Sequence, residues 1–294
     1  MHQNNQTKKD LVTIVTVTYN AEELLEDTIN SVMNQTYKNI EYIIIDGSST
    51  DGTIDIIKKH EDQIDYWISE PDDGIYFAMN KGIKKATGEW INFMNAGDTF
   101  VDNTTIQKVM NSRDKDTELI YGDHICDGTI GQAKDRKITR SMPCCHQSLF
   151  VKTALMKQYP YNTFYSISAD YEFLLKMYQL GKNFKYIEEP LARYMRNGFS
   201  DQNQTRWYLE TLTLMMNNNI DLDEIVQSAA YNLIENKKLV NLQHKYNIDI
   251  EKRDKTITLQ KNFILDVFSI KWYKHPIQTL KAIKRLYLFY KTIS

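Results

Sequence analysis

The feature that most constrains the fold is a series of short apolar segments in the first hundred residues, each followed by a segment of helical pattern. Residues 11–19 form a continuous β-branched run, which is typical of a strand buried on both faces. Similar segments recur at residues 41–45, 66–69 and 90–94. Between them, apolar residues stand at helical spacing in 21–35, 50–59 and 75–86. Strands that alternate with helices predict an α/β domain with a mostly parallel sheet.

The pattern changes after residue 100. Residues 119–121 and 184–187 are strand-like, and 124–140 indicate a hairpin whose turn is Asp127-Gly128. A helix is predicted over 169–180, and the rest of the chain is helical in pattern, at about 203–218, 222–245, 250–269 and 275–292. We therefore expect a disordered tail over 1–10, an α/β domain over 11–200 and a helical region over 201–294.

The composition excludes several classes of protein. The 294 residues are 42% hydrophobic and 25% charged with a net charge of −2, which is ordinary for a globular chain and does not favour nucleic acid as a partner. The longest apolar run, at 11–19, is too short to span a membrane, and the polar first ten residues do not resemble a secretory signal. Three cysteines make no disulfide framework, so we expect a cytoplasmic location.

Polar residues follow three of the predicted strands, as Tyr19-Asn20, Asp46-Gly47-Ser48 and Asn95-Ala96-Gly97-Asp98. In parallel sheets, ligands bind beyond the carboxyl ends of the strands, which places a site there. A carboxylate such as Asp46 can accept hydrogen bonds from a base or ribose, and one or two carboxylates with phosphates and water hold Mg²⁺ or Mn²⁺. The alternative is that each aspartate only forms a turn or caps a helix.

Four segments carry a family resemblance, in order along about residues 11–198: VTIVTVTYNAEELLEDTINSVMNQTY, EYIIIDGSSTDGT, EPDDGIYFAMNKGIKKATGEWINFMNAGD and SADYEFLLKMYQLG. Together they resemble the inverting glycosyltransferases of family 2, and the nearest similar proteins build bacterial surface polysaccharides. The resemblance implies a GT-A fold, with a Rossmann-like central sheet flanked by helices, to which a helical C-terminal extension is added here.

The resemblance also implies a set of donor-binding residues. The loop that contacts the nucleotide matches Thr18, Tyr19, Asn20 and Glu22; the residue that reads the base matches Asp46, beside Gly47. The loop and helix that close over the nucleotide match Asp73, Gly74, Asn80 and Lys81. The metal motif, usually Asp-x-Asp, matches Asn95, Ala96, Gly97 and Asp98. Only Asp98 is acidic there, so Mg²⁺ or Mn²⁺ would rely on this one carboxylate and the donor diphosphate.

The general base of the family matches Asp170, at the start of a predicted helix. A carboxylate there can take the proton of an acceptor hydroxyl, or it can simply cap the helix. Glu172 is a weaker candidate, for contact with the acceptor or for a salt bridge. In similar enzymes a His-Gln pair faces the acceptor, so His146-Gln147 can contact the acceptor here or have a structural role. Arg196, and less so Arg193, can reach a diphosphate bidentately. Cys144 and Cys145 are adjacent, which does not suit a zinc site.

The end of the chain is distinct in charge. Residues 261–294 hold seven Lys or Arg residues against one acid, Asp266. A basic helix with aromatic residues on its other side, over 270–294, is typical of peripheral contact with a membrane, or of a helix packed on the catalytic domain. Helices within 222–269 can instead form a homodimer, although their heptads are irregular.

The sequence therefore predicts an inverting glycosyltransferase that moves a sugar from a nucleotide sugar, most simply a UDP-sugar, to a saccharide or polyprenyl-linked acceptor. Two alternatives remain. A nucleotidyltransferase would need a Gly-rich, arginine-bearing loop after the first strand, where the chain has Tyr19-Asn20-Ala21-Glu22. An inactive nucleotide-sugar-binding or scaffold protein is suggested by Asn95 and Gly97 in the metal motif.

Overall fold

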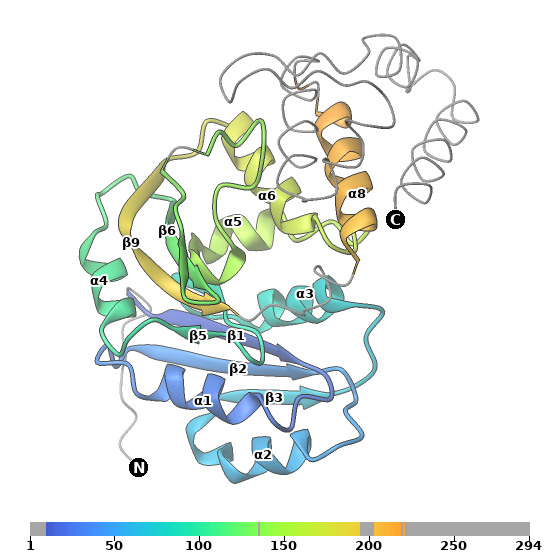
Figure 1. The fold of residues 1–294 in the computed structure, drawn as a ribbon. Helices are drawn as coiled ribbons and strands as arrows, with labels where there is room; N and C mark the ends of the chain where they lie inside the picture. The colour runs from blue at the N-terminus through green and yellow to red at the C-terminus, as the bar shows by residue number, and fades with distance from the viewer. Residues whose placement is uncertain (1–9, 135, 195–202, 219, 221–294) are drawn as a thin grey trace. The chain divides into compact units, whose positions relative to one another are not determined.

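The computed structural model describes residues 10–134, 136–194, 203–218 and 220 (Figure 1). The chain divides into two compact units, residues 1–202 and 203–294, and each is described by itself. The predicted tail at 1–10, apart from Asp10, the helices predicted beyond residue 220, and the basic segment 270–294 lie outside the described residues.

The first unit is built on a mixed sheet with the strand order β3-β2-β1-β4-β8-β6-β9-β5. Its first half comprises β1 (Val12–Thr18), β2 (Ile40–Asp46), β3 (Tyr66–Ser69) and β4 (Trp90–Phe93). These four strands pair in parallel, which confirms the predicted parallel sheet. In the register of β1 and β2, Thr18 lies opposite Asp46, so the polar residues that end the two strands are neighbours.

Helices cover both faces of this half-sheet. They are α1 (Leu25–Met33), α2 (Thr53–Lys59) and α3 (Ile75–Lys85), with a 3₁₀ turn, η1, at Glu61–Gln63. Alternate residues of a strand point to opposite faces: Val12 and Ile14 belong to a core cluster with residues of α1, whereas Val15 lies against Gly82 of α3. All seven residues of β1 are buried, which explains why its sequence is continuously apolar or β-branched instead of alternating.

The second half of the sheet is largely antiparallel. It comprises β5 (Thr99–Phe100), β6 (Leu119–Cys126), β7 (Thr129–Gly131), β8 (Leu149–Lys152) and β9 (Phe184–Tyr194). Strand β8 pairs antiparallel with both β4 and β6, while β6 and β9 are parallel. The hairpin turn at Asp127-Gly128 is confirmed, with φ values of 48° and 74°, but the hairpin ends at Gly131 and β9 runs past the predicted end at 187.

The remaining elements connect these strands. They are α4 (Thr105–Asn111), the 3₁₀ turn η2 (His146–Ser148), α5 (Thr153–Gln158) and α6 (Ala169–Gln179). In the second unit, α8 (Gln204–Asn217) lies where a helix over 203–218 was predicted. Among the described residues, no helix has the length and apolar character needed to cross a membrane.

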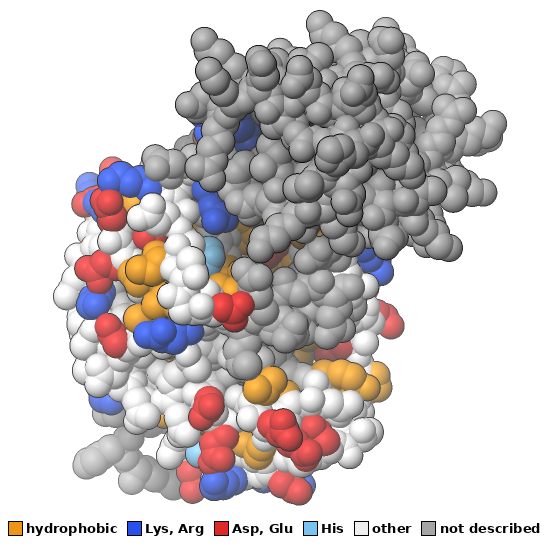
Figure 2. Space-filling model, in the orientation of Figure 1, with side chains coloured by type: hydrophobic (Ala, Val, Ile, Leu, Met, Phe, Trp, Pro, Cys, Tyr) orange, Lys and Arg blue, Asp and Glu red, His pale blue; other side chains and the backbone are white. Residues whose placement is uncertain are grey.

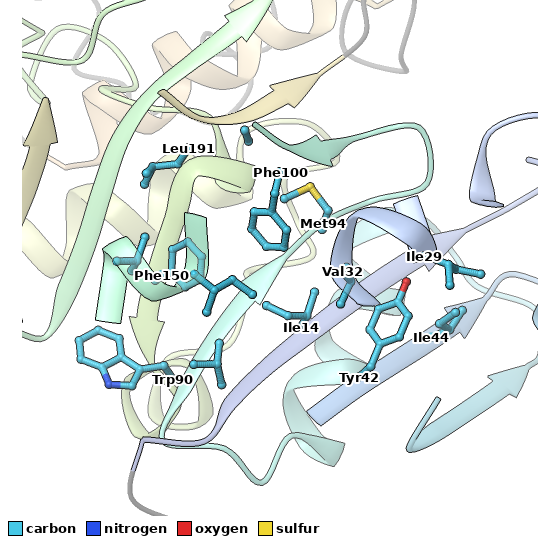
Figure 3. Packing of buried hydrophobic residues seen from close by; sticks show 14 of the residues in the cluster. Ile14, Ile29, Val32, Tyr42, Ile44, Trp90, Met94, Phe100, Phe150 and Leu191 are labelled. Carbon is cyan, nitrogen blue, oxygen red and sulfur yellow. The ribbon is translucent and has the colours of Figure 1, made fainter. Parts of the chain in front are cut away.

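The core of the first unit joins the two halves of the sheet. Figure 3 shows Ile14, Val32 and Tyr42 in the same cluster as Trp90 and Phe150. Trp90 and Phe150 lie on the neighbouring strands β4 and β8, and both are essentially fully buried. Such burial contributes about 1.5–3 kcal/mol per large side chain, so the parallel and antiparallel halves are stabilised as one sheet. On the face of this unit shown in Figure 2, acidic and basic side chains are interspersed.

Gly82 allows α3 to approach β1 closely. A Cβ added at Gly82 would lie 2.4 Å from Val15 Cγ1, inside the van der Waals distance.

In an exposed helix, Gly→Ala stabilises by about 1 kcal/mol. At Gly82 we instead expect Gly82→Ala to lower the free energy of unfolding by about 1–3 kcal/mol through overpacking, measured by urea denaturation. Lys84→Ala, at an exposed position of the same helix, is the control, and Val15→Ala should restore part of the loss. A gain in stability for Gly82→Ala would contradict this packing.

Candidate active site

The loops that follow β1 and β2 are joined by hydrogen bonds. The Asn20 backbone N–H donates to Ser49 Oγ at 2.8 Å, and the Thr50 N–H donates to Asn20 Oδ1 at 2.9 Å. Glu22 Oε2 accepts from the N–H of Gly52 at 2.7 Å, and Gly52 is the residue directly before α2. Asn20 and Glu22, predicted to contact a nucleotide, therefore hold two strand-end loops in one arrangement, beside the exposed ring of Tyr19.

Asp46 lies under this pair of loops and is fully buried. Its Oδ2 accepts from the Ser49 N–H at 2.9 Å and from Ser69 Oγ at 2.6 Å, and its Oδ1 accepts from Ser49 Oγ. The neighbouring Gly47 donates its N–H to Thr18 O at 2.9 Å. In this structure the carboxylate thus orders the turn after β2 and links it to the end of β3.

The loop before α3 is held in place by ion pairs. Lys81 makes ion pairs with Asp72 at 2.6 Å and with Glu70 at 2.7 Å. Burial lowers the pKa of the Lys81 ammonium, but its hydrogen bonds with Asp72 and Glu70 more than offset this, so its pKa is raised. Asn80 exchanges two hydrogen bonds with the backbone of Tyr161, at 2.9 and 3.0 Å. Lys81 therefore braces the loop that ends in Asp73-Gly74, and Asn80 joins α3 to the segment that contains Tyr161.

The segment Asn95–Asp98 makes a tight turn after β4. Gly97 has a φ of 95°, which favours glycine, and its N–H donates to Thr28 Oγ1 at 2.9 Å. The same hydroxyl donates to the backbone O of Asp98 at 2.9 Å, while the Ala96 N–H donates to Val17 O at 3.1 Å. The turn is thereby fixed between α1 and the end of β1, and it presents the Asp98 side chain.

One 3₁₀ turn, η2, reaches two of the predicted carboxylates. Gln147 Nε2 donates to Asp98 Oδ2 at 2.7 Å, and His146 Nδ1 lies 3.4 Å from Asp170 Oδ2. The other imidazole nitrogen, His146 Nε2, is 2.8 Å from Asn95 Nδ2. The Asn92 side chain, on β4, donates to the backbone O of Gln147 at 2.9 Å. The metal-motif turn and the proposed base are therefore linked through two consecutive side chains.

Asp170 lies in the first turn of α6 and is 7% exposed. Its Oδ1 accepts from the Tyr171 N–H at 2.9 Å and is 2.9 Å from Tyr76 Oη. That hydroxyl is also 2.6 Å from the Ile167 carbonyl oxygen, so its one proton serves two acceptors. Burial raises the pKa of Tyr76 well above its ordinary value, and the charge of Asp170 raises it further, so the hydroxyl stays protonated. Asp170 thus satisfies a helix N–H, as a capping residue does, and keeps Oδ2 directed toward His146.

Three polar atoms of the predicted site residues are buried and have no hydrogen-bond partner among the described residues. They are Thr18 Oγ1, Asn95 Oδ1 and Gln147 Oε1. Buried polar atoms are normally paired with protein, water or ligand groups. Because these three lie at the ends of β1 and β4 and in η2, the region is suited to a polar ligand.

The donor set at Asp98 suits a divalent cation that is also held by a ligand. Asp98 is 8% exposed, and Mg²⁺ or Mn²⁺ commonly takes one carboxylate together with phosphate oxygens and water. Among the described residues, no group of three or more His, Cys, Asp or Glu side chains has the arrangement of a metal site. The residues therefore fit a cation that binds with a diphosphate better than one held by the protein alone.

The other predicted residues are placed less centrally. Glu172 is half-buried on α6, and burial raises its pKa. Arg193 is exposed on β9 opposite Thr99, and Arg196 lies outside the described residues. Sequence reasoning did not single out Thr28, Ser69 or the Tyr76 hydroxyl as partners of the site, because their contacts join segments 23–94 residues apart.

Of the two adjacent cysteines that precede η2, Cys144 is buried and Cys145 is half-buried. Cys144 is 2% exposed, and burial raises its thiol pKa well above the ordinary value. Burial likewise raises the pKa of Cys145 to about 11. Since the thiolate is the form that binds metal, these residues act as packing groups at neutral pH.

Comparison with known proteins identifies the family. The sequence model of "Glycosyl transferase family 2" matches residues 13–187, which include the candidate site from Thr18 to Glu172. A "PGL/p-HBAD biosynthesis glycosyltransferase" of Mycobacterium tuberculosis is 30% identical over 178 residues, covering 57% of this chain and 70% of that protein.

Two solved structures have the same fold. Residues 1–349 of TarS from S. aureus, in complex with UDP-GlcNAc, superpose with a TM-score of 0.58 at 17% identity, covering 86% of this chain and 78% of that one. Glucosyl-3-phosphoglycerate synthase from Mycobacterium tuberculosis, with Mn²⁺, UDP and phosphoglyceric acid, gives a TM-score of 0.53 at 15% identity, covering 71% and 79%. The chain therefore belongs to glycosyl transferase family 2 and is a glycosyltransferase with the GT-A fold.

Proposed function

We propose that the enzyme transfers a sugar with inversion from a nucleoside diphosphate sugar to an acceptor hydroxyl, with Asp170 as the general base. The observation that carries this proposal is the environment of Asp170. One of its oxygens is anchored by Tyr76 and Tyr171, and the residue pair His146-Gln147 connects the carboxylate to Asp98. A base and a leaving-group site are thereby coupled through one rigid turn.

The chemistry requires these two groups on opposite sides of the sugar. The acceptor hydroxyl is a weak nucleophile at neutral pH, so Asp170 takes its proton as the acceptor oxygen bonds to the anomeric carbon. The bond from that carbon to the diphosphate oxygen breaks, and the electron pair leaves with the diphosphate. Attack on the face opposite to the leaving group inverts the anomeric centre.

UDP is the donor nucleotide we propose. The loops after β1 and β2 would carry the uridine, with the exposed ring of Tyr19 available to pack against a planar base and the Asp46 turn beside it. Thr18 Oγ1, which has no partner among the described residues, supplies a further polar contact. The two structural neighbours bound to UDP-GlcNAc and to UDP support this choice.

Asp98 is the residue we propose as the ligand of Mg²⁺ or Mn²⁺. A divalent cation bound there supplies positive charge against the diphosphate as the leaving group forms. Gln147 donates to the Asp98 carboxylate, and backbone hydrogen bonds from Ala96 to Val17 and from Asp98 to Asn95 fix the turn that carries it. The neighbour that contains Mn²⁺ together with UDP supports this role.

The acceptor we propose is a saccharide or a polyprenyl-linked glycan of a bacterial surface polysaccharide, extended on the cytoplasmic side of the membrane. We propose that His146, Gln147 and the half-buried Glu172 contact it. A membrane contact through 270–294 and a dimer through 222–269 remain predictions from sequence, and both segments lie outside the described residues.

The role of the base is tested by Asp170→Asn. This change keeps the shape of the side chain and removes its ability to take a proton, so kcat should fall at least about 10²-fold. UDP affinity by calorimetry should be unchanged, because the effect is on chemistry. Gln179→Ala, at an exposed position of α6, is the control. Normal turnover of Asp170→Asn in a radiolabelled-sugar transfer assay would remove Asp170 from the mechanism.

The role of Asp98 is tested by UDP calorimetry with and without Mn²⁺. We expect Mn²⁺ to tighten UDP binding to the wild type and to have no such effect on Asp98→Ala, because this carboxylate would hold the cation that binds together with a diphosphate. Asp127→Ala, in the hairpin turn, is the control. Equal wild-type affinity in both buffers would count against the metal role and would favour the inactive-binding alternative suggested by Asn95 and Gly97 if transfer were also absent.

A further inference from the structure

Resting on the proposed role of Asp170, we infer that Asn95 and His146 are positioning residues for the base. Asn95 holds His146 in the tautomer that carries its proton on Nδ1, and that N–H is directed at Asp170 Oδ2. The position that the family usually fills with the first acid of the metal motif thus acts on the base side of the reaction in this chain.

The assignment of the tautomer follows from the donor and acceptor chemistry. Asn95 Nδ2, 2.8 Å from His146 Nε2, can only donate, so Nε2 must be the lone-pair nitrogen and the neutral ring carries its proton on Nδ1. If the Asn95 amide were reversed, its oxygen would require a proton on Nε2. The Nδ1 lone pair of a neutral ring would then face the Asp170 carboxylate, which is repulsive.

The contact between His146 and Asp170 is suited to a base awaiting substrate. The separation of Nδ1 and Oδ2 is 3.4 Å, and the two side chains are only 16% and 10% exposed. Catalytic hydrogen bonds are often long without substrate and shorten when it binds. Because the imidazole is neutral, its N–H orients the carboxylate through a hydrogen bond and places no positive charge beside it.

A count of lone pairs on Asp170 shows what remains for the acceptor. A carboxylate offers about four acceptor positions. Oδ1 faces two donors, Tyr76 Oη and the Tyr171 N–H, and Oδ2 faces the His146 Nδ1–H. Among the described residues, these three donors leave one position, on Oδ2, for the proton of the acceptor hydroxyl.

The other titratable groups near Asp170 and His146 hold their charge state at neutral pH. Tyr76 on α3, Tyr161 before α6, and Cys144 and Cys145 before η2 all have pKa values raised by burial. The more distant charges are Arg136, which acts on Cys144, and Asp98, which acts on Cys145. His146 is therefore the neighbour whose charge a substitution at Asn95 can change.

Two substitutions of His146 test whether the site needs an N–H donor directed at Asp170 or only a side chain of similar size. His146→Asn keeps an amide donor where Nδ1 stands, and His146→Gln moves that donor to the place of Nε2, away from Asp170. We expect His146→Gln to lower kcat on the order of 10- to 100-fold, the loss that follows when the orienting partner of a metal-ligating side chain is removed, with the KM for the UDP-sugar unchanged. His146→Asn should recover most of that loss. Equal losses in the two variants, or no loss in either, would overturn the inference.

The tautomer is observed directly by long-range ¹H–¹⁵N correlation spectra of the ¹⁵N-histidine-labelled full chain, in metal-free buffer near pH 8. The resonance lost in His146→Asn assigns His146 among the six histidines. We expect a proton on Nδ1 in the wild type; a proton on Nε2 or on both nitrogens would refute the arrangement.

Asn95→Asp provides the complementary change. A carboxylate at 95 accepts a proton from Nε2 and favours imidazolium, so the His146 pKa should rise, and the acidic limb of the kcat/KM pH profile should move to higher pH because the imidazolium weakens the base. An unmoved His146 titration would contradict the inference.

The inference and the proposed function can fail separately. If Asp170→Asn were fully active while the Nδ1 tautomer was observed, Asp170 would not be the base, but the arrangement of Asn95 and His146 would stand.

Discussion

The burial of β1 on both faces is the constraint on which the site depends. Because β1 is enclosed by α1 on one side and α3 on the other, and by β2 and β4 at its edges, it cannot shift its register without exposing apolar residues. The turns that follow β1, β2 and β4 are therefore held next to one another, at the carboxyl ends of these three strands. Hydrogen bonds from Gly47 to Thr18 and from Ala96 to Val17 extend this order past the ends of the strands.

A second constraint connects the parallel and antiparallel halves of the sheet. The turn η2 precedes β8, which pairs with β4 of the first half and β6 of the second. Asn92, buried on β4, donates to the backbone oxygens of Gln147 and Leu149 and so holds the end of the turn against β4. Placement of His146 and Gln147 between two carboxylates is thus a consequence of how the two half-sheets join.

The sequence predicts the first half of this molecule well because its determinants are local. Continuous β-branched runs, helical spacing and strand-end polar residues each act within a few residues, and the four parallel strands follow from them. The antiparallel strands β5 and β8 were not predicted, since β5 has only two residues and β8 takes its direction from pairing with distant strands. For the same reason, the Tyr76–Asp170 contact could not be predicted, because it joins residues 94 positions apart in the sequence. The sequence was sufficient to identify the acidic residues of the site. Their hydrogen-bond partners became known only from the folded structure.

The neutral residues in the metal motif acquire a physical explanation from this arrangement. A buried carboxylate at 95 would need a cation or a charged imidazole beside it, because an unpaired buried charge is costly. An imidazolium at 146 would in turn oppose the proposed function of Asp170 as a base, since a positive neighbour favours the ionised, less basic carboxylate. An amide at 95 avoids both costs and still supplies a donor to His146 Nε2. The metal motif therefore carries its negative charge at Asp98, on the proposed diphosphate side. Asn95 and a neutral His146 connect the motif to Asp170 without adding a charge of their own.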